Sequence, residues 1–249
     1  MSLLVRDLKL LFIMAPHTGC TAIGTLLRER FDAEWVPPEG ILSLDGRSRV
    51  PTKHTRYSQL IDEGLITPEQ RAQLTVAVGV RNPFDEEVSH YLKREREFIP
   101  RRDDPATRRK LVGDKPARKM RPLDFEAWLK RRYVGTFRSR LRRQPPRRAP
   151  DWTTGADVIL RFERLQADFD ALMERLGVTE PAVIPVVNQT GPRQKRPYQV
   201  FYNAASRQIV ERVFAEKLAK FGYRFEPLPG GWTEDRHSRE ALAAETDTS

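Results

Sequence analysis

The sequence is poor in cysteine and in long apolar runs. Its 249 residues include one cysteine, Cys20, and four histidines. A lone cysteine cannot form an internal disulfide, which argues against a disulfide-stapled secreted protein and predicts a cytoplasmic location. No apolar run approaches the roughly 20 residues that span a bilayer. The histidine, cysteine and carboxylate residues show no ligand spacing typical of a metal site, so no metal is expected.

Basic charge is concentrated in one part of the chain. The net charge is +10, but residues 93–150 hold 21 basic and 7 acidic residues, a balance of +14, which leaves −4 for the remainder. This region is either a pair of solvated loops or a lip that recruits an anionic acceptor or a membrane surface with acidic lipids. It has no nucleic-acid recognition motif and few aromatic residues, which argues against binding to nucleic acid.

Short apolar runs alternate with amphipathic stretches along the chain. Strands are predicted at residues 8–14, 34–36, 74–80 and 157–161. Helices are predicted at residues 22–30, 57–63, 82–92, 124–134, 165–176 and 203–221, and another is predicted to start at Thr67. This order predicts an α/β protein with a central parallel, doubly wound sheet flanked by helices. We expect one domain over residues 1–229, with basic loops at 98–122 and 138–155 and a polar, flexible tail at 230–249.

The loop between the first strand and the first helix is rich in small residues. It reads PHTGCT over residues 16–21. A phosphate needs several backbone N–H groups and a helix N-terminus behind them, and small residues such as Gly19 and Thr21 let the backbone come close. The GxxxxGK[ST] pattern of Walker-type sites is absent. The loop therefore predicts either a phosphate site or an ordinary tight turn.

A second set of anion-binding residues follows the strand at 74–80. Arg81 leaves this strand just before a helix that Asn82 is expected to cap, and Ser89 lies two turns into that helix. Ligands bind beyond the carboxyl ends of parallel strands, where Arg81 and the first loop would both lie. An arginine and a serine facing one pocket can bind a second phosphate, although Arg-Asn-Pro alone is simply a capped helix start.

The two elements in this order resemble the phosphate-binding signatures of sulfotransferases that use 3′-phosphoadenosine 5′-phosphosulfate (PAPS). The stretches are LFIMAPHTGCTAIGTLL at 11–27 and VAVGVRNPFDEEVSHYL at 76–92. The segment ILRFERLQADFDALMERLGV at 159–178 is similar to the family's later strand and helix. NQTGPRQKRPYQVFYN at 188–203 and FAEKLAKFGYRF at 214–225 are similar to its C-terminal section. The resemblance implies the P-loop-like sulfotransferase fold and PAPS as sulfuryl donor, with 3′,5′-phosphoadenosine as product and no metal.

The resemblance also assigns the ligand-binding residues. Arg81 and Ser89 would hold the 3′-phosphate, and Arg193 would lie near the nucleotide, with Lys195 and Arg196 as competitors for that place. The residues that would meet the 5′-phosphosulfate are Thr18, Gly19, Cys20, Thr21 and Ala22, together with His17.

His17 is the main departure from the family pattern. It stands where the family has a lysine that stabilises charge on the leaving phosphate. An unperturbed histidine, with a pKa of about 6.5, is mostly neutral at pH 7, but neighbouring phosphates should raise that pKa. Either His17 is cationic when ligand is bound, or Lys53 takes its place, or the protein binds the nucleotide and turns over slowly.

Sulfuryl transfer also needs a base for the acceptor hydroxyl. The segment containing Lys53 and His54 looks like the catalytic Lys-His or lone His of several sulfotransferase subfamilies, so His54 is the expected base. The alternatives are an exposed loop histidine with no such role, or a carboxylate base at Glu39 or Asp45. Cys20 has no supporting base in the sequence and is read as a small loop residue.

Two other functions fit parts of the sequence. One is a nucleotide kinase-like P-loop enzyme, which the missing Walker lysine disfavours. The other is a non-catalytic module on the same fold that binds anions or nucleic acid. For the sulfotransferase, the sequence leaves the oligomeric state open, and it leaves open an acceptor that is a small molecule, a glycan, a lipid or a peptide tyrosine.

Overall fold

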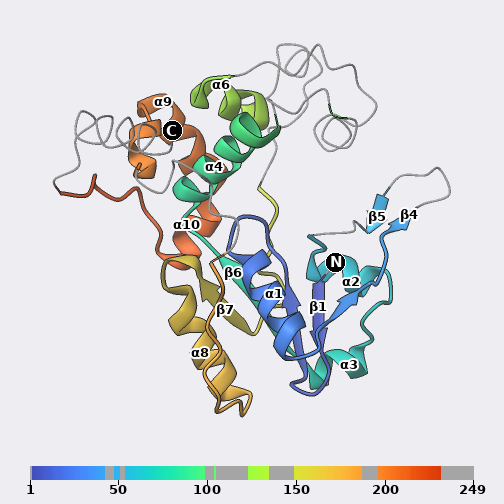
Figure 1. Cartoon of the computed structure of the whole chain (residues 1–249). Coiled ribbons are helices and arrows are strands. Elements are labelled where there is room, and N and C mark those ends of the chain that lie inside the picture. Colours follow the sequence, from blue (N-terminus) through green and yellow to red (C-terminus); the bar gives the residue numbers. More distant parts are fainter. Residues whose placement is uncertain are drawn as a thin grey trace. The chain divides into compact units, whose positions relative to one another are not determined.

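The computed structural model describes residues 2–42, 48–50, 54–98, 104, 123–134, 149–186 and 196–230. The chain divides into two compact units (Figure 1). The first, which we call the sheet unit, comprises Met1–Arg81 and Pro150–Asn188. The second, the helical unit, comprises Asn82–Ala149 and Gln189–Ser249. One domain over residues 1–229 stays a prediction.

The sheet unit is built on a five-stranded sheet in the order β3-β1-β2-β6-β7. Its three strands β2 (Leu10–Ile13), β6 (Thr75–Val80) and β7 (Val158–Arg161) run parallel. The register pairs Ile13 with Val78 and Val80 with Arg161. The carboxyl ends of these three strands therefore meet at one edge of the sheet, as the predicted α/β topology requires.

The other two strands correct the prediction of a wholly parallel sheet. The strand β1 (Ser2–Val5), which the sequence reading missed, pairs antiparallel with β2 and with β3 (Glu34–Val36). A turn joins β1 to β2, with the Lys9 amide donating to the Arg6 carbonyl at 3.0 Å. Residues 2–13 thus form a hairpin, and the sheet is mixed with a parallel centre.

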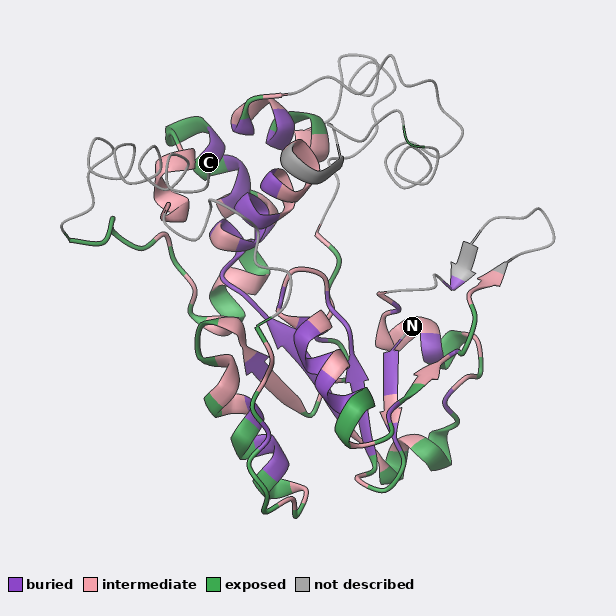
Figure 2. Ribbon diagram, in the orientation of Figure 1, coloured by how far each residue is buried: buried purple, intermediate pink, exposed green. Residues whose placement is uncertain are grey.

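Helices cover both faces of this sheet. They are α1 (Cys20–Arg30), α2 (Tyr57–Asp62) and α8 (Leu165–Arg175). The helix α3 (Pro68–Gln73) has no buried residue, and β4 (Ile41–Leu42) pairs with β5 (Ser48–Val50) in a separate ribbon. Alternate residues of β2 pack on opposite sides, as the period of two in a strand requires. Leu10 and Phe12 face α1 and α8, whereas Leu11 and Ile13 face α2. Figure 2 shows the central strands buried.

Several helix starts follow the expected capping chemistry. Thr67 caps α3, with its hydroxyl accepting from the Gln70 amide and the Gln70 side chain accepting from the Thr67 amide. The predicted α8 ends one residue before the expected position, and Gly177 follows with φ 82°. The helices α8 and α3 therefore both begin where the sequence predicts, at Leu165 and directly after the N-cap Thr67.

A polar anchor ties the start of β7 to its neighbours. The Asp157 carboxylate accepts from the Val76 amide at 2.8 Å and from Arg71 at 2.7 Å. Burial acts to raise the pKa of Asp157, but the Val76 N–H and the Arg71 guanidinium outweigh it and hold that pKa below its usual value. This anchor lies at the end of β7 opposite to Arg161 and helps to fix the strand's register.

The helical unit contains α4 (Pro83–Leu92), α6 (Phe125–Leu129), α9 (Ala204–Val213) and α10 (Ala215–Phe221). A π-helical turn continues α4 over Lys93–Phe98 and another continues α6 over Lys130–Val134. The 3₁₀ turn Tyr198–Phe201 precedes α9. The single helix predicted over 203–221 is two helices, because the chain leaves helical geometry at Phe214 with φ −109° and ψ 18°.

Aromatic side chains dominate the core of the helical unit. The buried residues are Phe84, Val88, Leu92, Phe125, Trp128, Leu129, Tyr133, Ile209, Val210 and Phe214. Asn82 caps α4 by accepting from the Phe84 amide at 3.1 Å, as predicted, and its side-chain amide donates to the Arg224 carbonyl. The residue that starts α4 therefore also holds the segment after α10.

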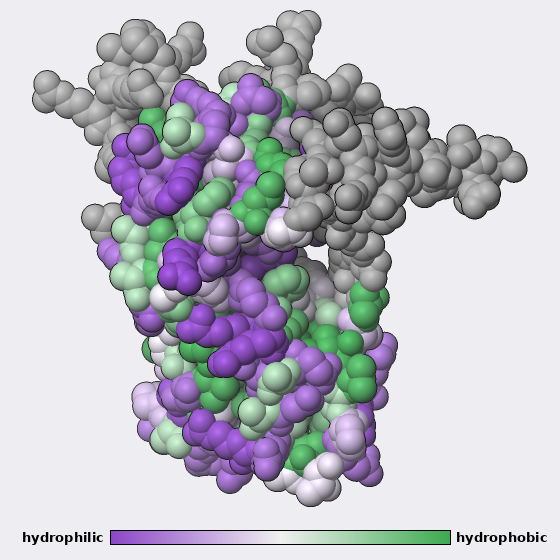
Figure 3. All heavy atoms as spheres, turned by 90° about the vertical axis from the view of Figure 1, so that its left-hand side faces the viewer, coloured by the Kyte–Doolittle hydropathy of each residue, from purple (hydrophilic) through white to green (hydrophobic). Residues whose placement is uncertain are grey.

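The described residues present both hydrophilic and hydrophobic side chains on the face that Figure 3 shows. Figure 3 shows hydrophilic side chains over most of the face that it presents, with hydrophobic residues scattered among them. Large hydrophobic residues such as Val183 and Val186 are exposed. Scattered exposure of this kind is normal for folded proteins. Within the described part of the chain, none of the helices has both the length and the apolarity needed to cross a membrane.

Candidate anion-binding site

The loop between β2 and α1 brings a helix N-terminus to the carboxyl edge of the sheet. Gly19 occupies the N-cap position in the left-handed region, with φ 80° and ψ 5°, and no side chain caps the helix. The first turn of α1 has no acidic residue. The positive end of the helix dipole is therefore not offset by a carboxylate of its own first turn, which suits an anionic ligand.

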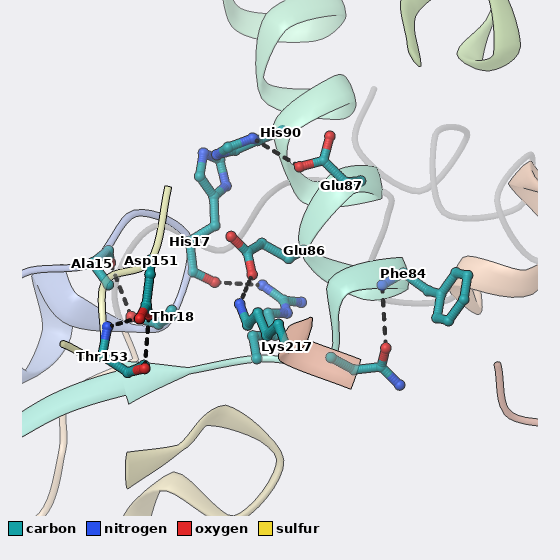
Figure 4. Close-up of polar contacts among 12 residues, drawn as sticks. Ala15, His17, Thr18, Phe84, Glu86, Glu87, His90, Asp151, Thr153 and Lys217 are labelled. Carbon is teal, nitrogen blue, oxygen red and sulfur yellow. Dashed lines mark hydrogen bonds and ion pairs between the residues drawn. The ribbon is translucent and has the colours of Figure 1, made fainter. Parts of the chain in front are cut away.

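The loop packs directly on the neighbouring strand β6. A Cβ atom on Gly79 would lie 2.5 Å from Thr18 Oγ1 and 3.1 Å from the Thr18 carbonyl oxygen, so only glycine fits beneath the loop. The buried Thr18 hydroxyl donates to the Ala15 carbonyl at 2.9 Å (Figure 4). In this conformation the hydroxyl closes the loop on itself, and a contact from that hydroxyl to phosphate stays a prediction.

Arg81 lies where the sequence places it, just beyond the carboxyl end of β6. Its side chain is largely buried, with Nη1 donating to the His17 carbonyl at 3.0 Å, a contact drawn at the labelled His17 in Figure 4. The guanidinium carbon lies 3.8 Å from the centre of the Phe162 ring. The first loop and Arg81 are therefore in direct contact within the sheet unit.

Both histidines singled out by the sequence have unusual backbone conformations. His17 has φ 61° and His54 has φ 63°; only two other described non-glycine residues, Lys9 and Asp32, have positive φ. Such conformations cost free energy and gather at functional sites. The His54 ring reaches the same edge of the sheet, because its Nδ1 lies 2.7 Å from the Met14 carbonyl oxygen.

The His54 contact fixes the state of the imidazole ring. A carbonyl oxygen only accepts, so Nδ1 must carry the proton, and the neutral ring then has its lone pair on Nε2. The Trp152 ring packs edge-on against His54, with 6.4 Å between ring centroids. The contact with Met14 spans forty residues, and no local pattern in the sequence indicates it.

Of the remaining predicted residues, the alternative base Glu39 is exposed and the alternative Arg196 belongs to the helical unit; the others fall into three groups. Cys20 and Ala22 are buried in the first turn of α1, which agrees with reading Cys20 as a small packed residue, and Thr21 is half-buried beside them. Ser89 is buried on α4, in the helical unit. Outside the described residues lie Lys53, Arg193 and the alternatives Asp45 and Lys195.

The structure adds residues that the sequence reading missed. Phe162, beneath Arg81, follows β7 directly, so the rule that ligands bind beyond parallel strand ends could have pointed to it. Gly79 and the Met14 carbonyl act through packing and main-chain contacts, which local patterns do not reveal. Over the described ranges, no group of three or more histidine, cysteine or carboxylate residues is arranged to hold a metal ion.

A second polar cluster lies in the helical unit. The buried Glu87 carboxylate accepts from the Tyr133 hydroxyl at 2.8 Å and lies 3.4 Å from Arg132 Nε and 3.5 Å from His90 Nδ1 (Figure 4 draws the His90 contact). Burial acts to raise the pKa of Glu87, but His90, Arg132 and Tyr133 together lower it. Burial and the carboxylate raise the pKa of the Tyr133 phenol. The cluster joins α4 to the π-helical turn after α6.

Comparisons with family models, with curated proteins and with solved structures found no match to this chain. Any assignment of function therefore rests on the residues and geometry given above.

Proposed function

We propose that the protein is a sulfotransferase that moves a sulfuryl group from PAPS to a hydroxyl acceptor. One observation carries the proposal. The adjacent parallel strands β2 and β6 bring the glycine-capped N-terminus of α1 and the buried Arg81 guanidinium together at one edge of the sheet, with Arg81 Nη1 3.0 Å from the His17 carbonyl. Two anion-binding groups side by side suit a ligand with two separate phosphates.

The residues present fit such a nucleotide chemically. The N-terminus of α1 offers backbone N–H groups and a positive dipole end to the 5′-phosphosulfate, through Gly19, Cys20, Thr21 and Ala22. Arg81 presents a planar fork of donors to the 3′-phosphate. A role for Ser89, which belongs to the helical unit, stays a prediction of the sequence. When bound, PAPS supplies the sulfuryl group, whose bond to the 5′-phosphate oxygen breaks as the acceptor oxygen bonds to sulfur.

His54 is proposed as the general base. With Nδ1 protonated and directed at the Met14 carbonyl, Nε2 is the nitrogen that accepts the proton of the acceptor hydroxyl. His17 is proposed to stabilise the charge that develops on the departing 3′,5′-phosphoadenosine, with Lys53 as a further cation. Positioning and charge stabilisation would supply most of the acceleration, as in phosphoryl transfer.

The proposed acceptor is a small molecule, a glycan or a lipid, and the basic region 93–150 supports one that carries negative charge. The single cysteine supports a cytoplasmic location for the enzyme. We propose that no metal takes part, because backbone N–H groups, Arg81 and His17 can neutralise the phosphate charge.

Nucleotide affinities test the proposal that PAPS is the sulfuryl donor. Calorimetry should show that 3′,5′-phosphoadenosine binds at least about tenfold more tightly than AMP, because only the first has the 3′-phosphate that pairs with Arg81. Arg81→Lys, which keeps the charge and loses the planar fork, should reduce this preference while leaving AMP affinity unchanged. Equal affinity for both nucleotides would refute the proposal, and ATP-dependent phosphoryl transfer would favour a kinase instead.

The rate of sulfuryl transfer tests the proposal that His54 is the general base. With PAPS and a panel of phenol, sugar and sterol acceptors, His54→Ala should lower the transfer rate by roughly 10²–10⁴-fold, the usual contribution of general base catalysis. Its affinity for 3′,5′-phosphoadenosine should stay within about twofold of the wild type. His237→Ala, in the C-terminal tail, is the matched control and should retain full activity. Unchanged turnover in His54→Ala would remove His54 from the mechanism.

A further inference from the structure

Phe162 lies where the next parallel strand brings an aromatic ring beneath Arg81. The strands β6 and β7 are in register at Val80 and Arg161, so the residue that follows each of these, Arg81 and Phe162, lies beside the other. The guanidinium carbon is 3.8 Å from the ring centre, compared with 5.3 Å for Arg28 over Trp35 in the same unit. Arg81 is therefore stacked on Phe162 rather than merely near it.

The same ring also contacts the first loop. A Cβ atom on Gly19 would lie 2.5 Å from Leu165 Cδ2 and 3.5 Å from Phe162 Cδ2, so the ring lies close to the N-cap of α1 as well as to Arg81. Phe162 belongs to the 3₁₀ turn Phe162–Arg164, directly before α8. Because it is held between a strand end and a helix start, the ring is a fixed platform.

Two contacts restrain the Arg81 guanidinium. Its carbon atom lies over the Phe162 ring, and Nη1 donates to the His17 carbonyl. A planar guanidinium restrained in this way presents its N–H donors in one plane, which is the geometry that binds two oxygens of one phosphate. An arginine without such a platform would lose rotamer entropy when it binds its ligand.

We propose that Phe162 is a positioning residue that orients Arg81 for the 3′-phosphate of the nucleotide. This inference rests on the proposed function, since the 3′-phosphate is the ligand that Arg81 is proposed to bind. Phe162 acts through Arg81 and makes no contact with the phosphate itself. It therefore sets the preference of the site for a nucleotide that carries a 3′-phosphate over one that lacks it.

Nucleotide affinities test this role. Phe162→Leu keeps an apolar contact with the loop but removes the ring, and it should weaken binding of 3′,5′-phosphoadenosine by about 3- to 30-fold, the range of a cation–π pair. Its affinity for AMP should change by less than about twofold. Phe162→Tyr keeps the ring and should bind like the wild type, and Trp35→Leu, which removes the Arg28 pair, is the matched control.

A double-mutant cycle separates positioning from a general structural effect. In the Arg81→Lys background, Phe162→Leu should add little to the loss of 3′,5′-phosphoadenosine affinity, because the planar group it orients is already gone. Additive losses, or an equal loss of AMP and 3′,5′-phosphoadenosine affinity in Phe162→Leu, would overturn the proposal.

A measurement without nucleotide keeps this inference distinct from the proposed function. Stacking on Phe162 should shift the Arg81 Nε–H proton signal upfield through the ring current, and Phe162→Leu should abolish that shift whereas Phe162→Tyr retains it. A signal that stays unchanged in Phe162→Leu would overturn the positioning role. If the wild type shows no preference for 3′,5′-phosphoadenosine over AMP, the proposed function fails, and the Arg81 signal still decides whether Phe162 orients Arg81.

Discussion

Replacing Gly79 by alanine should displace the loop that precedes α1. The new Cβ atom would lie 2.5 Å from Thr18 Oγ1 and 2.9 Å from Thr18 Cβ, where ordinary contacts begin at 3.4 Å. Thr18 cannot rotate away easily, because its branched side chain is buried and its hydroxyl is bonded to the Ala15 carbonyl. The loop itself must therefore move, by about half an ångström or more.

The magnitude follows from the cost of overpacking a close-packed interior. Such insertions typically cost about 1–3 kcal/mol, which for a chain of this size lowers the melting temperature by roughly 2–4 °C per kcal/mol. The displaced loop also carries the N-cap of α1. Because a shift of about 1 Å can cost about 100-fold at a positioned site, Gly79→Ala should weaken binding of 3′,5′-phosphoadenosine by at least roughly tenfold.

Thermal unfolding and calorimetry of the same preparation provide the assay. Gly24→Ala is the matched control, since its new Cβ would meet only the ends of the flexible Met14 and Leu3 side chains, at 3.0 and 3.1 Å. It lies inside α1, where alanine favours the helix by up to about 1 kcal/mol over glycine. It should leave affinity unchanged. A Gly79→Ala variant with wild-type stability and affinity would refute the reasoning about loop packing.

Two further predictions concern carboxylates that accept hydrogen bonds in the folded state. Because the folded state lowers the pKa of Asp157, its stabilisation is present above the unfolded pKa of about 3.9 and is lost as the pH falls through the folded value. Asp157→Asn should therefore show a weaker fall in unfolding free energy between about pH 5 and pH 2, measured by urea titration; identical pH curves would contradict this. Tyr133→Phe removes the hydroxyl that donates to Glu87 and should cost about 1–3 kcal/mol in the same titration, whereas a loss below about 0.5 kcal/mol would mean that the buried carboxylate finds another donor.

Local chemistry made much of the sheet unit predictable. Thr67, Pro68 and Gln70 form a capping box because side-chain and backbone groups three residues apart satisfy each other, whatever the rest of the chain does. The run that became β6 is apolar because both faces of a central strand are buried. Arg81 was placed correctly at a strand end for the same reason.

Strand pairing and long-range contacts were harder to predict from the sequence. The missed strand β1 is four residues long, and its antiparallel pairing depends on the turn at residues 6–9 rather than on any periodicity. The clue was present, since two apolar runs separated by four residues are typical of a hairpin. The break at Phe214 and the contact of His54 with Met14 depend on neighbours far along the chain, which a single sequence does not specify.

The group that faces His54 Nδ1 at 2.7 Å is a main-chain carbonyl, that of Met14. A carboxylate in that place would ionise in acid and could be lost by a single substitution, whereas an amide carbonyl has no ionisation in the working pH range. Substitution of the Met14 side chain alone would also leave that partner in place.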